Sequence, residues 1–216
     1  MGGKGEELSW RRSQALSGGG MKRLENLRET GRGTARERLD ALLDPDSFVE
    51  IDALINHRNH QGNMHVHPQF GDGVVAGHGS VDGRRVFCFS QDFTVFGGSM
   101  GEMHAKKITK VIEMAERARV PLICIWDGGG QRAHDGVHSL AATGEMLDRL
   151  VSCSGRIPMV SLVLGPVVGV SALAAAIADF VILDNDLITS AENRIPLTNI
   201  VATFINGELV FNRRFN

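Results

Sequence analysis

Two glycine-rich turns hold the backbone groups of this sequence that are best suited to chemistry. Residues 128–130 are three glycines after the apolar run 122–126, and residues 165–169, Gly-Pro-Val-Val-Gly, follow the apolar run 159–164. Glycine adopts positive φ values and lets a ligand approach the backbone closely. N–H groups that point into a crevice at such a turn can stabilise negative charge on an enolate or thioester oxygen. An oxyanion site is therefore one interpretation of this spacing.

Plainer interpretations of these glycines stay open on spacing alone. The turns could be tight connections between strands and helices, in which small residues serve packing. A phosphate-binding P-loop is excluded, because neither turn is followed by the Gly-Lys-Ser or Gly-Lys-Thr that this loop requires. The choice between packing and charge stabilisation depends on the elements around the turns.

Strands that alternate with helices are expected to position both turns. Apolar residues at three-and-four spacing predict a helix over residues 100–119, and a second helix over 139–153 separates the two apolar runs. A small-residue segment, 165–178, predicts a short helix, and residues 180–183 predict a third strand. This alternation is typical of parallel βαβ units covered on both faces. Ligands of such sheets bind at the carboxyl ends of the strands, where both turns lie.

The flanking segments predict two hairpins and a polar arm. β-branched and aromatic runs on both sides of Asp82-Gly83 predict a hairpin that turns at this pair. Residues 1–33 are rich in glycine and charge and predict short surface helices. A second hairpin is predicted over residues 200–211, around an Asn-Gly pair.

The order of these features resembles one enzyme family. Residues 71–101 read GDGVVAGHGSVDGRRVFCFSQDFTVFGGSMG and precede a helix and the triple-glycine turn. Together with residues 34–39, Thr-Ala-Arg-Glu-Arg-Leu, they are similar to the carboxyltransferase subunit of biotin-dependent acyl-CoA carboxylases, of the propionyl-CoA carboxylase β-chain type. The resemblance begins near Leu24 and extends to about residue 183.

This resemblance implies an α/β fold of the crotonase-like (ClpP/crotonase) class, a ββα superhelix, as a single truncated N-terminal carboxyltransferase domain. It divides the chain into an N-terminal arm with short helices at 1–33, the crotonase-like domain at 34–183, and a divergent tail with a β-hairpin at 184–216. In the family the C-terminal domain of a neighbouring subunit completes the active site. We expect another chain to supply that domain.

The family's two turns can be compared with this sequence position by position. The first, Asp-Ser-Gly-Gly-Ala-Arg-Ile-Gln-Glu-Gly, corresponds to residues 127–136, with Gln131 in place of alanine. The second, Gly-Pro-x-x-Gly-Gly-Ala, corresponds to residues 165–171, with Val170 in place of the second glycine. A β-branched residue disfavours positive φ. The resemblance assigns the catalytic backbone oxyanion donors to Gly129, Gly130, Gln131, Gly169 and Val170.

The resemblance also implies a surface that binds acyl-CoA. Residues 91–94 and 96–99 match the family's most recognisable block. The CoA phosphates favour contacts with Arg or Lys, although charges on helix faces are more often solvated. Candidates for these phosphate contacts are Arg36, Arg38, Lys106 and Lys107. The expected substrate-binding residues are Arg36, Phe96, Gly97, Gly98, Arg132 and Gly136.

The implied activity is transfer of a carboxyl group from carboxybiotin to the α-carbon of a short acyl-CoA, such as propionyl-CoA or acetyl-CoA. The expected partners are the acyl-CoA, a biotin carboxylase or a biotin carrier subunit that holds the biotin, and other subunits of a homo- or hetero-oligomer. The alternative is a truncated, non-catalytic remnant that binds acyl-CoA or a partner subunit. A stand-alone crotonase-like hydratase or decarboxylase needs a paired carboxylate. Glu145 and Asp148, three apart on one predicted helix, are more typical of a solvated face.

The composition sets the remaining expectations. A chain of 216 residues with 43% hydrophobic content can bury one core. The net charge of −2 and the scattered Lys and Arg residues disfavour a nucleic-acid partner. No apolar stretch reaches the roughly 18 residues of a membrane span. We expect a soluble, cytoplasmic protein without a membrane contact.

Cysteine and histidine usage predicts no metal site. The three cysteines are widely spaced, and we expect buried, reduced thiols. The histidines between residues 57 and 67 include His65-x-His67, but no cysteine or carboxylate joins them to complete a ligand set.

Overall fold

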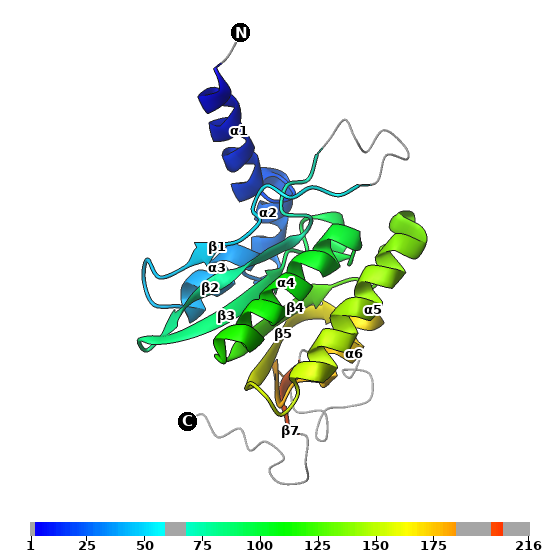
Figure 1. The fold of residues 1–216 in the computed structure, drawn as a ribbon. Coiled ribbons are helices and arrows are strands. Elements are labelled where there is room, and N and C mark those ends of the chain that lie inside the picture. The colour runs from blue at the N-terminus through cyan, green and yellow to red at the C-terminus, as the bar shows by residue number, and fades with distance from the viewer. Residues whose placement is uncertain (1–2, 59–67, 185–199, 205–216) are drawn as a thin grey trace.

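Among the residues that the structure describes, one mixed sheet of seven strands, ordered β1 to β7 as in the chain, forms the centre (Figure 1). The computed structural model describes residues 3–58, 68–184 and 200–204. The strands are β1 (Val49–Glu50), β2 (Val74–Val81), β3 (Arg84–Gln91), β4 (Leu122–Gly128), β5 (Met159–Val167), β6 (Phe180–Asp184) and β7 (Ile200–Phe204). The helices are α1 (Lys4–Leu16), α2 (Met21–Glu29), α3 (Ala35–Leu42), η2 (Phe96–Gly98), α4 (Glu102–Ala118), η3 (Ala133–Asp135), α5 (Gly136–Cys153) and α6 (Val170–Ala176).

The direction of the strands confirms the predicted βαβ units. Strands β3, β4, β5 and β6 pair in parallel, and α4, α5 and α6 make the three connections between them. Strands β1, β2 and β3 pair antiparallel, as do β6 and β7. The predicted turn between β2 and β3 is confirmed as well, because Asp82 and Gly83 have φ values of 50° and 74°. A type I′ turn requires positive φ at both positions.

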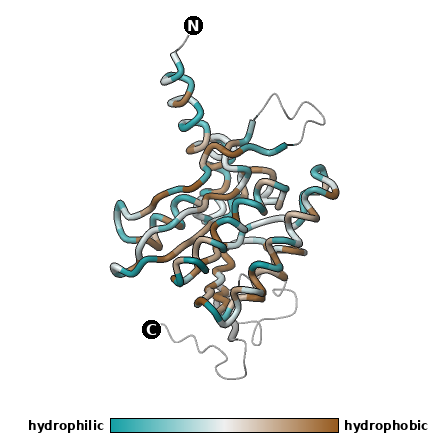
Figure 2. The backbone as a smooth tube through the Cα atoms, viewed as in Figure 1, coloured by the Kyte–Doolittle hydropathy of each residue, from teal (hydrophilic) through white to brown (hydrophobic). Residues whose placement is uncertain are grey.

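Helices cover both faces of the sheet. The larger hydrophobic core lies between one face and helices α4, α5 and α6, and includes Phe89, Ile112, Trp126 and Met146. A smaller core lies between the opposite face and α3, which contributes Ala35 and Leu39. Hydrophobic residues therefore follow the central strands, whereas α1, which projects from the body, is mostly hydrophilic (Figures 1 and 2).

The short helices predicted in the N-terminal arm are present as α1 and α2. Helix α3 begins with a capping box: the Thr34 hydroxyl accepts from the N–H of Glu37, and the Thr34 N–H donates to Glu37 Oε2 at 2.8 Å. The division of the chain at residues 33 and 183 stays a prediction. Strand β7 is the first strand of the predicted C-terminal hairpin, and the Asn206-Gly207 turn lies outside the described residues.

The cysteines are free and buried, as expected. None of the helices in the described ranges has the length and hydropathy of a membrane span. Those ranges also contain no cluster of three metal-ligand side chains, and His60, His65 and His67 lie outside them.

Candidate functional site

The two glycine turns lie against each other at one end of the sheet. Strands β4 and β5 are parallel neighbours, so the turns that follow them share an edge. Gly130 has a φ of +78°, and a Cβ atom added to it would lie 2.9 Å from the carbonyl oxygen of Val168. Only glycine fits this backbone contact. The structure therefore brings together the two turns that the sequence placed at strand ends.

Backbone hydrogen bonds decide which N–H groups of the first turn are available. The Gly129 N–H donates to the carbonyl oxygen of Gly97 at 2.9 Å, and the Gly130 carbonyl accepts from the N–H of Met100 at 2.7 Å. The N–H groups of Gly130 and Gln131 donate to no acceptor among the described residues. Gly130 and Gln131 are thus the available donors of the first turn, and Gly129 is already engaged.

The second turn places its positive φ on Gly169 rather than on Val170. Gly169 has φ 58° and ψ −125°, and Val170 is the first residue of α6. The strain that the sequence predicts for a β-branched residue at this position is therefore absent. The first N–H groups of a helix lack intrahelical partners. Val170 thus keeps the donor that the family pattern assigns to a glycine.

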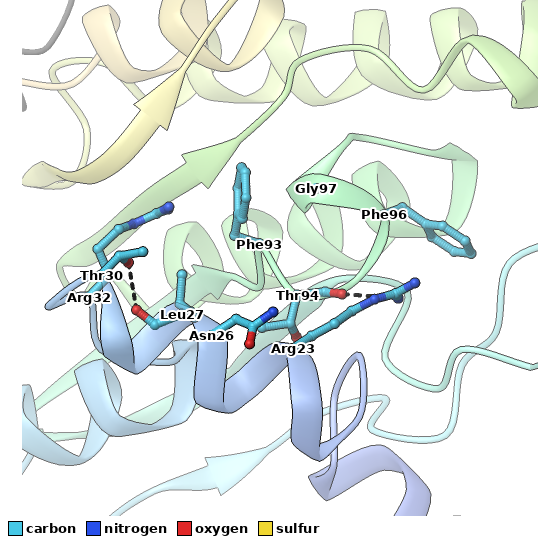
Figure 3. A pocket seen from close by; sticks show the side chains of 9 residues that line it. All are labelled: Arg23, Asn26, Leu27, Thr30, Arg32, Phe93, Thr94, Phe96 and Gly97. Atoms are coloured by element: carbon cyan, nitrogen blue, oxygen red, sulfur yellow. Dashed lines mark hydrogen bonds between the residues drawn. The ribbon is translucent and has the colours of Figure 1, made fainter.

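A pocket of about 490 Å³ lies beside the first turn (Figure 3). We call it the α2 pocket. Its wall comes from α2, the segment after it, and the loop after β3. Gly97, whose carbonyl oxygen accepts from Gly129, is part of the wall, so the pocket and the turn share a backbone hydrogen bond. The lining residues are Arg23, Asn26, Leu27, Thr30, Arg32, Phe93, Thr94, Phe96 and Gly97.

Two arginines line this pocket. The Arg32 guanidinium carbon lies 4.6 Å from the centroid of the Phe93 ring, within the range of a cation–π contact. Arg23 reaches the carbonyl oxygen of Thr94 at 3.4 Å and is otherwise exposed (Figure 3). The sequence interpretation missed both residues, because nothing in the polar arm indicates that it folds against a loop some 70 positions later.

Asp127, the first residue of the turn motif, is fully buried between two arginines. Its carboxylate pairs with Arg32, and Arg38 Nη1 lies 2.8 Å from Asp127 Oδ2. Burial raises the pKa of the Asp127 carboxyl, and the two guanidinium groups oppose that shift. Arg38 also donates to the carbonyl oxygen of Leu164 at 2.8 Å, so one guanidinium joins the ends of β4 and β5.

Arg132, expected to contact substrate, is engaged inside the protein. Its guanidinium donates to Asp72 Oδ1 at 2.5 Å and to the carbonyl oxygen of Ser99 at 2.7 Å, and only 3% of the residue is exposed. The ring of Phe96 lies 4.7 Å from the guanidinium carbon and 5.5 Å from the ring of His57. Arg132 therefore supports the loop that shapes the α2 pocket.

The glycines of the expected binding surface serve close packing or a turn. A Cβ atom on Gly98 would collide with the carbonyl oxygen of Asp127, and Gly98 has a φ of +64°. Gly136 has φ 55° and ψ −138° at the start of α5, with open space around it.

The candidate phosphate contacts all have partners within the chain. Arg36 pairs with Glu50 at 2.8 Å, and Lys106 pairs with Glu102. Lys107 is buried and donates to the carbonyl oxygen of Val74 at 2.7 Å. Arg38 is buried against Asp127. Glu145 and Asp148 are both exposed on α5, as a solvated face predicts.

The chain matches the family model described as "Carboxyl transferase domain" over residues 26–192. It belongs to this family. The match extends nine residues beyond the predicted limit at 183, which sequence motifs alone did not indicate. The predicted resemblance to carboxyltransferases is thereby confirmed.

Curated relatives of this carboxyl transferase domain are propionyl-CoA carboxylase subunits. The propionyl-CoA carboxylase beta chain of Roseobacter denitrificans is 45% identical over 181 residues, which are 84% of this chain and 36% of the relative. The carboxyltransferase subunit from Haloferax mediterranei is 40% identical over 206 residues, 95% of this chain and 39% of the relative. The domain thus spans little more than a third of the length of these relatives.

Solved structures confirm the predicted crotonase-like fold. The transcarboxylase 12S structure with methylmalonyl-coenzyme A and methylmalonic acid bound has a TM-score of 0.80 and 39% identity. This likeness covers 83% of this chain and 35% of that chain.

Proposed function

We propose that this domain forms the acyl-CoA side of a carboxyltransferase, which moves a carboxyl group from carboxybiotin to the α-carbon of a short acyl-CoA. The observation that carries the proposal is the contact between the two glycine turns at the ends of β4 and β5. The N–H groups of Gly130 and Gln131, which have no acceptor among the described residues, lie there beside the α2 pocket. The propionyl-CoA carboxylase relatives favour propionyl-CoA or a similar short acyl-CoA.

The α2 pocket suits the CoA part of the substrate. Arg23 offers positive charge for phosphate groups, and Phe93 and Leu27 offer apolar contact, whereas the Arg32 guanidinium already pairs with Asp127. Gly97 joins the pocket to the turn, so a ligand that fills the pocket can place its thioester near Gly130. This arrangement supports Phe96 and Gly97 as parts of the binding surface, and it adds Arg23 and Arg32.

The backbone donors would act on the thioester oxygen. Loss of the α-proton turns the acyl-CoA into an enolate, and N–H groups held in place beforehand stabilise the negative oxygen without reorganisation. Neutral donors of this kind fit a thioester carbonyl and the ureido carbonyl of biotin. When bound, carboxybiotin supplies the carbon dioxide and the base. The residues of this domain orient the acyl-CoA and stabilise its charge.

Other chains would supply the rest of the reaction. The matched residues span only 36% and 39% of the relatives, and the biotin would arrive on a carrier or on a biotin carboxylase subunit. Apolar residues on the outer side of α5, Val137 and Leu140, are 73% and 59% exposed and offer a surface for assembly. We propose a homo- or hetero-oligomer as the working form.

A binding module without catalysis is the second candidate. The observation that favours it is the Gly129 N–H, which donates to Gly97 and so removes one of the predicted oxyanion donors. Such a module would bind acyl-CoA or a partner subunit and leave the chemistry to other chains.

Calorimetric titration of the 216-residue chain with propionyl-CoA and with pantetheine tests the proposal. Saturable binding of propionyl-CoA, with weaker binding of pantetheine, is expected because Arg23 can contact the phosphate groups that pantetheine lacks. Absence of binding would contradict the proposal and would leave only a module that binds a partner subunit. Transfer of the carboxyl group from methylmalonyl-CoA to biotin, assayed with the subunit that supplies the rest of the site, separates the two candidates: Gly130→Ala should abolish this transfer if the turn takes part in catalysis and should leave it unchanged if this chain only binds.

A further inference from the structure

Two buried polar side chains are linked to the residue that precedes the first glycine turn: Gln91 bonds to the backbone of Asp127, and His104 bonds to Gln91. We infer that Gln91 and His104 are positioning residues, which fix the backbone at Asp127 and so aim the N–H groups of Gly130 and Gln131. The inference rests on the proposed function of that turn. Gln91 and His104 both have 0% exposure, and neither is a lining residue of the α2 pocket.

The donors and acceptors in this series of hydrogen bonds can be assigned in only one way. His104 Nδ1 lies 2.9 Å from the carbonyl oxygen of Asp72, which can only accept, so Nδ1 carries the proton. The bare Nε2 of His104 then accepts from Gln91 Nε2 at 3.2 Å. The remaining Gln91 atom, Oε1, accepts from the backbone N–H of Asp127 at 3.0 Å.

The reversed amide of Gln91 would fail at both ends. Its oxygen would face the lone pair of His104 Nε2, and its NH₂ group would face the N–H of Asp127. Burial lowers the pKa of His104 to about 3, so the ring stays neutral and keeps the lone pair that Gln91 needs. The hydrogen bonds that join Asp72, His104, Gln91 and Asp127 therefore have one stable arrangement.

The same network also holds the far end of the turn. Asp72, whose carbonyl accepts from His104, uses its carboxylate to accept from Arg132 at 2.5 Å and from the His104 N–H at 2.9 Å. Asp127 and Arg132 are the residues on either side of the turn. The two donors between them are thus held from both sides, which is the preorganisation that charge stabilisation requires.

Gln91→Met tests the inference, because it keeps the volume and removes both hydrogen bonds. Two ligands are titrated calorimetrically into the full chain: propionyl-CoA and its thioether analogue S-propyl-CoA, which lacks the carbonyl. The wild type should prefer propionyl-CoA by about fivefold, the value of about one hydrogen bond. Gln91→Met should lose this preference while its affinity for the thioether stays within about twofold.

Two further variants make the result decisive. Gln91→Glu, which when protonated can make the same two bonds, should keep the preference. Thr109→Val removes another buried hydrogen bond of α4, from Thr109 to the carbonyl oxygen of Ala105, and should keep the preference despite lower stability. If Gln91→Met retains the preference, the positioning role is overturned and the proposed function stands. If the wild type binds both ligands equally, the turn does not bind the thioester carbonyl and the positioning role is overturned. If it binds neither ligand, the proposed function itself is contradicted.

Discussion

The N–H of Gly129 donates to the carbonyl oxygen of Gly97 at 2.9 Å. This bond joins a strand end to the loop that forms the wall of the α2 pocket. A change that moves either glycine should therefore alter both ligand binding and the geometry of the turn.

Gly130→Ala should weaken acyl-CoA binding more than a substitution that only places alanine at a positive φ. Gly130 has a φ of +78°, and an added Cβ would lie 2.9 Å from the Val168 carbonyl oxygen. The turns must separate, which should lower the affinity for propionyl-CoA about tenfold and the free energy of unfolding by about 1–3 kcal/mol. Gly83→Ala, with a φ of +74° and open space, is the control for φ alone. Equal effects on stability with unchanged affinity would contradict the prediction.

Arg38→Met should be strongly destabilising, because it leaves the buried Asp127 carboxylate short of a partner. The Arg38 side chain is 7% exposed and that of Asp127 is 0% exposed. The loss should be about 3–5 kcal/mol in chemical denaturation. Arg11→Met, which removes an ion pair whose side chains are 48% and 59% exposed, should change stability by less than about 0.5 kcal/mol. Adding Asp127→Asn to Arg38→Met should recover part of the loss, and a further loss would contradict the buried-charge explanation.

Stability should rise between pH 8 and pH 9 through Lys107. Burial lowers the pKa of Lys107 from 10.5 to about 8, so within this window the unfolded chain binds more protons than the folded one. The free energy of unfolding should then increase by at most about 1.4 kcal/mol per pH unit. Denaturation of Lys107→Met should show a flatter pH dependence, and Lys110→Met, an exposed control, should match the wild type. A wild-type stability that falls across this window would refute the prediction.

Arg23→Gln should weaken propionyl-CoA binding about three- to tenfold without a change in stability. Arg23 lines the α2 pocket and is exposed, so its charge is available to a phosphate group. Titrations at two salt concentrations should show a weaker salt dependence for the variant. Arg12→Gln, an exposed residue of α1 away from the pocket lining, should bind like the wild type. Equal affinities for both variants would exclude a CoA phosphate from this pocket.

Much of the fold follows from local sequence patterns. Helix α4, strands β4 and β5, and the Asp82-Gly83 turn were predictable because hydrophobic spacing and turn chemistry act within a few residues. The site was only partly predictable. Its turns could be predicted because glycine residues mark them in the sequence. The hydrogen bond from the Gly129 N–H to the Gly97 carbonyl could not, because it depends on a loop about 30 residues earlier.

The long-range polar contacts escaped sequence reasoning for the same reason. Arg32 and Arg38 meet Asp127 only after the chain has wound through the sheet, and a charged residue on a predicted helix gives no sign of its partner. Val170 shows the opposite error. The sequence indicated strain at a β-branched residue, but the neighbouring Gly169 absorbs the unusual φ.

The three cysteines have a chemical consequence for the proposed acyl-CoA function. Burial raises the pKa of Cys88 to about 12 and that of Cys153 to about 11, and it raises the pKa of Cys124 as well. Only a thiolate attacks a thioester. The buried, protonated cysteines therefore do not attack an acyl-CoA thioester. The acyl group stays on CoA, and acylation of the protein does not compete with carboxyl transfer.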